Sequence, residues 1–333
     1  MRTFLLVLLL CLECAAQGLK VYAIDVEGGK ATLYVSPSGE SMLLDAGYAG
    51  NGGRDADRIV AAMRDAGVRQ IDYLVITHYH ADHVGGVAQL AARVPIRNFV
   101  DHGPTFEAKD TGGLFETYTA VRAKGKHIVV KAGDRIPIQG LQVDVVSASG
   151  IPLPNALPGA GSPNPLCAGF APIKPDEGEN AHSIGIIVTL GRFRLSDLGD
   201  LYWNQEGDLA CPTNRIGRVD VYMTTHHAKK TSGAPALVQA MRPRAAIMNN
   251  SDDNGASEEH WETIHQSPDH PDIWQLHYAS KNRKRDNAPR AFIANLKSQG
   301  CEGFGILLKA NPDGSFVIRN QRTSKEKRYL PSR

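Results

Sequence analysis

The chain has 333 residues, a formal net charge of +2 and a hydrophobic fraction of 42%. This length allows one large domain, or two domains of ordinary size, around a substantial buried core. The near-neutral charge gives no support for binding nucleic acid through bulk charge. We therefore expect no stable complex with nucleic acid.

The first 16 residues have the three-part pattern of a signal peptide. Arg2 supplies a basic start, residues 4–12 are apolar, and the small residues at 14–16 offer a cleavage site. The apolar run is too short to span a bilayer, and no later stretch is long and apolar enough to do so. We expect a mature chain that begins near Gln17 and is secreted or periplasmic. The alternative is a buried N-terminal helix or strand.

The expected strands and helices alternate from residue 19 onward, with no linker that would divide the chain. The expected strands lie at residues 19–26, 31–36, 41–44, 71–76, 184–190, 219–225 and 245–248, with another that begins at 192. The expected helices lie at residues 54–66, 84–92, 234–241 and 257–265. Strands at 306–310 and 315–319 form a C-terminal β-hairpin. This order predicts a single domain over residues 17–333, with two sheets covered by helices on their outer faces.

Two segments of this domain are expected to be irregular or short-stranded. Residues 94–146 predict short strands that alternate with turns, and residues 149–180 predict a long loop, which a compact domain usually keeps for a function.

Three cysteines remain in the mature chain, Cys167, Cys211 and Cys301. They have no C-x-x-C spacing, which argues against a structural zinc site made of cysteines. An exported protein can hold a disulfide. Cys167 and Cys211 lie close to prolines in loop-like sequence, so we expect these two to pair and Cys301 to stay free.

Residues 77–86 follow an apolar strand and bring three histidines and one aspartate close together in the chain. Their sequence is T-H-Y-H-A-D-H-V-G-G. Because alternate residues of an extended chain point to the same side, His78 and His80 can reach one cation. Asp82 and His83 follow, where the chain turns into a helix. Imidazole and carboxylate are ligands of divalent metals and leave room for water, so the run predicts a metal site. The alternative, a polar loop with incidental histidines, fits this spacing poorly.

This run resembles the H-x-H-x-D-H motif of the metallo-β-lactamase superfamily, and the match is complete. Other segments resemble that superfamily in the same order along the chain. Residues 43–47 resemble its L-I-D-x-G strand end, residues 196–200 resemble its segment ending in G-D, and residues 226–227 resemble its last metal-binding strand end.

The N-terminal residues 24–31 resemble the D-V-G-Q-G-D-A start of the ComEC-like subgroup, with departures at Glu27 and Lys30. The resemblance covers most of residues 19–265. It implies an α+β fold, a four-layer αββα sandwich, with a metal pair at one edge of the sheets.

The resemblance also implies two divalent metal ions, with zinc as the first choice and manganese or iron as alternatives. The implied ligands are His78, His80, Asp82, His83, His182, Asp200 and His226, with His227 as the second choice for the last position. His78 and His80 would bind one metal and Asp82 and His83 the other. Asp200 would bridge the two metals.

Three of these assignments have alternatives. Asp197 is the alternative to Asp200 as the bridging ligand, although Asp200 fits the G-D pattern better. Asp200 could also be a plain turn residue without a metal-binding role. His182 begins a segment that resembles H-[ST]-x-G and would complete the first metal's ligands, or it is a surface histidine. Either His226 or His227 takes the last position.

Other polar residues are expected near the same edge. Asp45 is expected to accept the N–H of a liganding histidine and fix its ring. His102 is expected in a loop at the same edge, where it would contact substrate or protonate the leaving group, unless it is a plain loop histidine. Asn249, Asn250 and His277 follow later strands and are candidates for the cleft lining.

The resemblance implies an exported metal-dependent hydrolase, in which a hydroxide activated by two metals attacks a phosphoryl or carbonyl centre and Asp82 orients the water. The substrate is expected to be a phosphodiester or another small molecule of the ester class. A lactone, a β-lactam or another ester is the alternative. Oxidation chemistry on a single iron, or binding without turnover, is the other alternative.

Overall fold

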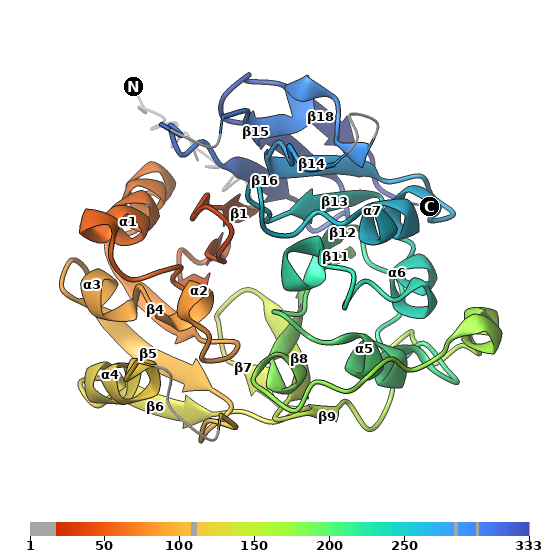
Figure 1. The fold of residues 1–333 in the computed structure, drawn as a ribbon, viewed down its shortest axis with the longest axis horizontal. Coiled ribbons are helices and arrows are strands. Elements are labelled where there is room, and N and C mark those ends of the chain that lie inside the picture. Colours follow the sequence, from red (N-terminus) through yellow and green to blue (C-terminus); the bar gives the residue numbers. More distant parts are fainter. Residues whose placement is uncertain (1–17, 108–111, 283–285, 298–299, 333) are drawn as a thin grey trace, which may run out of the picture.

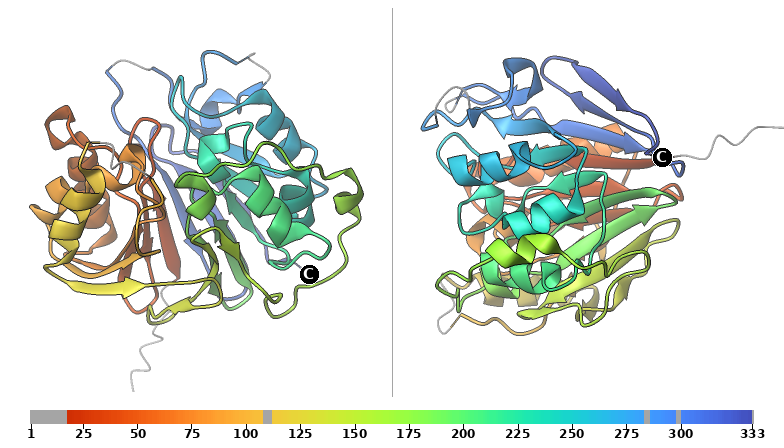
Figure 2. Two further views of the ribbon diagram at one scale, coloured as in Figure 1. Left: turned by 60° about the horizontal axis from the view of Figure 1, so that its bottom comes forward. Right: turned by 90° about the vertical axis from the view of Figure 1, so that its right-hand side faces the viewer.

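The computed structural model describes residues 18–107, 112–282, 286–297 and 300–332. The predicted signal peptide, residues 1–16, lies outside the described residues. Two mixed sheets pack face to face, and helices cover both outer faces (Figure 1, Figure 2). The predicted four-layer αββα arrangement is therefore confirmed. No helix of the described segments has the length and apolarity needed to cross a membrane.

The first sheet contains both ends of the described chain. Its strands are β1 (Leu19–Ala23), β2 (Thr32–Val35), β3 (Ser41–Leu44), β4 (Ile71–Val75), β5 (Ile96–Asp101), β6 (Lys126–Val129), β16 (Ile306–Ala310), β17 (Phe316–Asn320) and β18 (Glu326–Tyr329). They lie in the order β18-β17-β16-β1-β2-β3-β4-β5-β6. The predicted hairpin is β16 and β17, and it extends this sheet by pairing with β1. From β3 to β6 the strands run parallel.

The second sheet is built from the middle of the chain. Its strands are β7 (Arg135–Ile136), β8 (Gln142–Ala148), β9 (Ile151–Pro152), β10 (Gly185–Leu190), β11 (Phe193–Asp197), β12 (Val221–Met223), β13 (Ala245–Met248), β14 (Asp272–His277) and β15 (Ile293–Asn295). They lie in the order β15-β14-β13-β12-β11-β10-β8-β7, with β9 paired to β8. From β11 to β15 the strands run parallel.

The helices divide between the two outer faces. The first face carries α1 (Arg54–Ala66), α2 (Ala81–Val84), α3 (Val87–Ala91) and α4 (Leu114–Arg122), and the second carries α5 (Trp203–Ala210), α6 (Pro235–Met241) and α7 (Glu258–His265). The left-hand view of Figure 2 shows the two groups on opposite sides of the sheets. Apolar side chains fill the space between the sheets, including Leu44 and Val75 from one and Val188 and Ile247 from the other.

Several elements differ from the sequence prediction: α5, β14, β15 and β18 were not expected, and two further differences lie in the first layer of helices. The helix predicted at 84–92 is divided into α2 and α3 at Gly85 and Gly86. A Cβ on Gly86 would lie 2.1 Å from the carbonyl oxygen of Ala46, so the chain can pass this close to the end of β3 only without a side chain. Within 94–146, helix α4 was not predicted, although its buried Tyr118 and Val121 follow a helical spacing.

The long segment 149–180 is tied to the second layer of helices by a disulfide. Cys167 and Cys211 are bonded, with their Cα atoms 5.7 Å apart, and Cys301 is free. Both predictions about the cysteines are confirmed. The bond joins the long segment to the residue that follows α5.

Candidate metal centre

Polar side chains from both sheets meet at one edge because of the parallel strands. Asp45 follows β3 and His78 follows β4, while Asp200 follows β11 and His227 follows β12. The carboxyl ends of adjacent parallel strands lie at the same edge of a sheet, and residues placed there face one another across the sandwich. The order of the strands therefore brings together residues that are up to about 180 positions apart in the chain.

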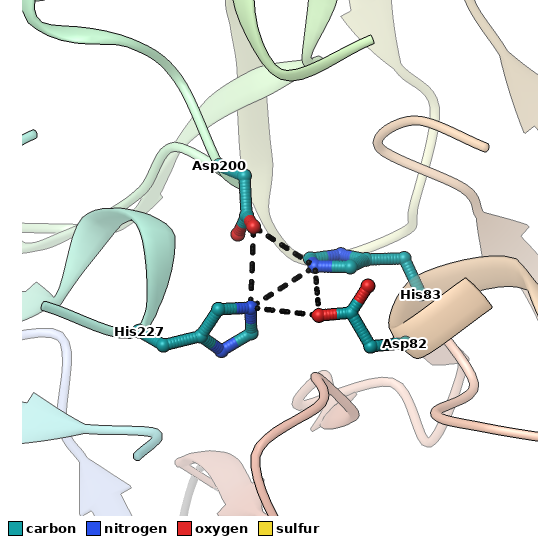
Figure 3. A group of neighbouring side chains, drawn as sticks. All are labelled: Asp82, His83, Asp200 and His227. Carbon is teal, nitrogen blue, oxygen red and sulfur yellow. Dashed lines mark hydrogen bonds and ion pairs between the residues drawn. The ribbon is translucent and has the colours of Figure 1, made fainter. Parts of the chain in front are cut away.

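Four of these residues, Asp82, His83, Asp200 and His227, form what we call the ligand group (Figure 3). Each offers one donor atom, and the four atoms lie within 4.8 Å of one another. Asp200 Oδ2 is 3.3 Å from His83 Nε2 and 3.1 Å from His227 Nε2. Asp82 Oδ2 is 3.2 Å from His227 Nε2, and the two imidazole nitrogens are 3.3 Å apart. Four predicted ligands thus converge on one point.

The outer nitrogen of each imidazole is held by a hydrogen-bond acceptor. His83 Nδ1 lies 2.7 Å from Asp45 Oδ2, and His227 Nδ1 lies 3.2 Å from the carbonyl oxygen of Asn249. An N–H at each Nδ1 leaves the lone pair at Nε2, which faces the centre. Asp45 also accepts from the amide and hydroxyl of Thr77, which follows the neighbouring strand. The role predicted for Asp45 is therefore confirmed.

Charges within the ligand group perturb one another strongly. Burial alone would raise the pKa of Asp200, but His227 and His83 hold it well below its usual value. Burial alone would lower the pKa of His83, but Asp200, Asp45 and Asp82 raise it well above its usual value. The pKa of His227 is raised by Asp200 and Asp82, against its own burial.

These residues fit a divalent cation. Two imidazole nitrogens and two carboxylates point at one another, and Asp200 Oδ1 is buried with no hydrogen-bond partner among the described residues. A buried carboxylate oxygen without a partner is costly. A cation between the four donors would remove the repulsion between their lone pairs, and binding would release the protons that the carboxylates otherwise hold on the imidazoles.

A second pair of ring nitrogens lies beside the ligand group. His78 Nε2 is 3.0 Å from His80 Nδ1, as expected for two residues that share one cation. His78 is fully buried, which holds the pKa of its imidazole well below the usual value, and its Nδ1 lies 3.1 Å from the hydroxyl of Thr77. His80 Nε2 is 3.4 Å from Glu107 Oε1, and 34% of its side chain is exposed. His80 therefore lies near the opening of the site, whereas His78 is buried.

The two histidines after β12 take different positions. The sequence prediction gave His226 as the last ligand, but the structure places His227 in the ligand group. His226 Nε2 is 3.7 Å from Asp200 Oδ2, and its Nδ1 contacts the hydroxyls of Thr231 and Ser232. Residues 226–228 all have positive φ, between 52° and 62°, and this tight turn sends the two rings in different directions. Burial lowers the pKa of His226 to about 4.

His182 is the main correction to the predicted ligands. Its ring stacks on Phe106, with centroids 3.6 Å apart and planes 10° apart, and its Nδ1 donates to the carbonyl oxygen of Gly178 at 2.7 Å. No contact joins it to His78, His80 or the ligand group in the described part of the chain. The pattern H-S-I-G was correct as the start of a strand, but the short 3₁₀ turn Asn180–His182 turns the ring toward Phe106.

His102 lies in the loop after β5, where it was expected. Its side chain is fully buried, its Nε2 lies 3.1 Å from Glu179 Oε2, and its Nδ1 has no hydrogen-bond partner among the described residues. Its contact with substrate and its proton donation to a leaving group stay predictions. Glu179 was missed by the sequence reasoning, because a single glutamate within the long segment 149–180 has no motif around it.

Glu179 connects three segments of the site. Its carboxylate accepts from His102 Nε2, the amide of Tyr79, the hydroxyl of Thr105 and the amide of Phe106, at distances between 2.6 and 3.1 Å. Burial alone would raise its pKa, but these donors lower it to about 2. The end of the long segment is therefore fixed to the metal-binding run and to the loop after β5.

Asp197, the rival of Asp200, has another partner. Lys30 Nζ lies 2.5 Å from its Oδ1 and the hydroxyl of Tyr34 donates to its Oδ2, with Lys30 and Asp197 fully buried. This pair explains the departure from the ComEC-like motif at Lys30. The backbone amide of Lys30 also donates to the carbonyl oxygen of Asp82, so the pair supports both ligand-bearing segments.

The remaining cleft candidates lie behind the centre. Asn249 contacts His227 as described above, Asn250 donates to the carbonyl oxygen of His277, and His277 pairs with Asp25 at 2.7 Å. All three are buried and do not line an open cleft, and of the three it is Asn249 that contacts the ligand group.

Comparisons with known proteins agree with this geometry. Residues 24–162 match the family model described as the metallo-beta-lactamase superfamily. "Recombination protein 2" of Haemophilus influenzae is 25% identical over 231 residues, which is 69% of this chain and 24% of that protein. "ComE operon protein 3" of Bacillus subtilis is 24% identical over 262 residues, which is 74% of this chain and 30% of that protein. The predicted ComEC-like resemblance is thus confirmed.

Shorter and structural similarities were also found. A "UPF0173 metal-dependent hydrolase" of Staphylococcus saprophyticus is 29% identical over 90 residues, which is 27% of this chain and 33% of that protein. The metallo-beta-lactamase fold protein YhfI of Bacillus subtilis has a TM-score of 0.47 and 10% identity, covering 78% of this chain and 96% of that one. The chain spans only about a quarter to a third of the length of the curated relatives it matches.

Proposed function

We propose that this chain is a metal-dependent hydrolase, since residues 24–162 match the metallo-beta-lactamase superfamily model. The observation that carries this proposal is the ligand group, in which two imidazoles and two carboxylates converge on one point. A relative named as a metal-dependent hydrolase gives further support.

The proposed centre holds two divalent cations. The ligand group would bind one, and His78 and His80 would bind the other, with Asp200 between them. Zinc is the first choice because imidazole and carboxylate are its usual ligands, and manganese or iron are alternatives. When bound, the cations would supply a water activated at neutral pH and would stabilise the charge that develops on the reacting group.

The residues of the chain would orient the reaction. Asp82 has the largest exposed fraction in the ligand group, 17% of its side chain, and its carboxylate would orient the attacking water. In the hydrolysis a phosphorus–oxygen bond forms to the water oxygen and the bond to the departing alcohol breaks. The proton released by the water ends on the departing oxygen. Asp45 and Asn249 would keep the rings of His83 and His227 in place throughout.

A phosphodiester or related ester is the proposed substrate class. The ComEC-like resemblance supports this choice. The net charge of +2 supports a small phosphodiester over a long nucleic acid held by bulk charge. Secretion or a periplasmic location is proposed from the N-terminal pattern, and the disulfide Cys167–Cys211 supports an oxidising compartment.

The test is hydrolysis by the mature protein, loaded with zinc or manganese, on a panel of phosphodiesters, lactones and β-lactams. We expect turnover of a phosphodiester, and loss of that turnover in His83→Ala. His277→Ala, a buried histidine outside the centre, is the matched control and should keep activity. A metal-loaded protein that hydrolyses nothing in the panel, or equal activity in His83→Ala, would overturn the proposal.

A further inference from the structure

An exposed aromatic ring lies at the mouth of the proposed centre. Phe106 is 43% exposed, one of few large apolar side chains of the described chain with so much surface in water. One face of its ring is stacked on His182 at 3.6 Å. An exposed aromatic ring that is already stacked on one side offers its remaining surface to another planar group.

Both rings are held rigidly by the end of the long segment. Glu179 Oε1 accepts from the amide of Phe106 at 2.6 Å and from the hydroxyl of Thr105 at 2.8 Å. The carbonyl oxygen of Gly178 accepts from His182 Nδ1 at 2.7 Å. Residues 178 and 179 thus fix the ring of His182 and the backbone of Phe106, and the Phe106 ring rests on His182, so little conformational freedom would be lost when a ligand stacks there.

The stacked pair is next to a predicted metal ligand. Glu107 directly follows Phe106, and its Oε1 lies 3.4 Å from His80 Nε2. His80 and Glu107 are both about one-third exposed, so this side of the centre is open to solvent. A substrate whose phosphorus is held at the metal pair would therefore extend a neighbouring group over Phe106.

We propose that Phe106 and His182 form a stacking platform for a planar aromatic group of the substrate, a nucleobase or an aryl ester. This inference rests on the proposed function and names the substrate class of the same site. It also gives His182 a role that needs no metal: its ring supports Phe106 from behind. Stacking of a planar group on a protein aromatic ring tolerates different ring systems, because every aromatic ring presents a flat π-face.

The experiment compares three phosphodiesters that share trifluoroethanol, which carries no ring, as the leaving group. The other substituent is methyl, benzyl or 5′-thymidyl, so the bond that breaks is the same in all three. We expect the wild-type protein to favour one or both of the ring-bearing esters over the methyl ester in kcat/KM. Phe106→Ala should lower that preference about tenfold, Phe106→Trp should keep it, and Leu330→Ala, another exposed apolar residue, should not change it.

The two ring-bearing esters distinguish a nucleobase site from an aryl site. His182→Phe should keep both the preference for a ring and the metal content. If His182 were a metal ligand, this variant would lose metal. No preference for a ring in the wild-type protein, or an equal loss on all three esters in Phe106→Ala, would overturn the platform.

A binding measurement separates the platform from the proposed function. If the metal-loaded protein cleaves none of the three esters, the proposed function has failed, and calorimetry with thymidine 5′-phosphate and ribose 5-phosphate then tests the platform. The platform predicts tighter binding of the nucleotide and loss of that difference in Phe106→Ala. Equal binding of the two phosphates by the wild-type protein would contradict it.

Discussion

Among the described residues, two clusters bring three or more histidine, cysteine or carboxylate donors together, and only one of these two is suited to a metal. The ligand group and the cluster of Asp25, His277 and Cys301 both hold three or more donor atoms within 4.8 Å of one another. They differ in what surrounds the donors. Proximity of donor residues is therefore a weaker sign of a metal site than the partners those residues already have.

In the second cluster the positive charge is already present. Arg58 Nη1 lies 2.9 Å from Asp25 Oδ2, and His277 Nε2 lies 2.7 Å from Asp25 Oδ1. Burial and Asp25 raise the pKa of Cys301 to about 12, so its thiol stays protonated and donates to Asp25 at 3.1 Å. The carboxylate is satisfied without a cation, and a thiol that keeps its proton is a poor ligand.

In the ligand group the partners lie on the outer side. Asp45 and Asn249 fix the imidazoles from behind, so their free nitrogens face the centre. Asp200 Oδ1 is buried without a described partner. This group gains from a divalent cation, whereas the second cluster would have to exclude Arg58 first.

The largest expected effect is in His227→Ala. The variant removes one of four converging donors, so metal affinity falls and kcat/KM on a phosphodiester drops by about three orders of magnitude. Metal content by mass spectrometry and initial rates check this. His277→Ala, from the second cluster, should keep its metal. If His277→Ala loses metal as completely as His227→Ala, the distinction between the clusters is wrong.

Asp45→Asn tests whether the hydrogen bond between Asp45 and the outer ring nitrogen of His83 contributes to metal affinity. The amide can still occupy the space but no longer carries the charge that holds the N–H of His83, so we expect metal affinity to fall by about 10- to 100-fold. Competition with a chelator of known affinity measures the change. Asp25→Asn is the matched variant in the second cluster, and its metal affinity should equal that of the wild-type protein.

The stability of the fold at acid pH should depend on Glu179, a buried carboxylate that already accepts hydrogen bonds from His102, Tyr79, Thr105 and Phe106. Its pKa is lowered from 4.5 to about 2 in the folded protein, so it contributes stability that is present above pH 4.5. That contribution is lost as the pH falls through the folded value. Denaturant unfolding between about pH 5 and pH 2 should show a smaller pH dependence in Glu179→Gln than in the wild-type protein. Parallel curves for the two proteins would rule out this role.

The smallest effect is expected in Cys301→Ser. Serine keeps a donor to Asp25 but changes the size of the group, so the free energy of unfolding should change by less than about 1 kcal/mol. Metal content should not change at all. Thermal unfolding and metal analysis test both points, and loss of metal would mean that this cluster holds a cation after all.

Much of the centre was predictable because its residues lie in one short run. The spacing of His78, His80, Asp82 and His83 is a local property of a strand end, and Asp200 is the second residue of a recognisable G-D dipeptide. The choice between His226 and His227 was not predictable, because it depends on three consecutive residues with positive φ. Such backbone angles are set by tertiary packing, and no glycine marks them in the sequence.

The surroundings of the centre were harder to predict. His182 has the right motif, but its ring direction depends on Phe106, which lies 76 positions earlier in the chain. Glu179 and Lys30 act through partners in other segments of the chain, and single charged residues give no periodic signal. The layers followed from strand and helix patterns, whereas α4 and the break at Gly85 depended on packing against neighbouring segments.

The most direct test of the account is the metal content per chain of the mature protein, purified without added metal and dialysed without chelator. The arrangement of the ligand group beside His78 and His80 predicts two divalent ions per chain. A protein that holds no metal, even after soaking in zinc or manganese, would contradict the central claim that these residues form a metal centre.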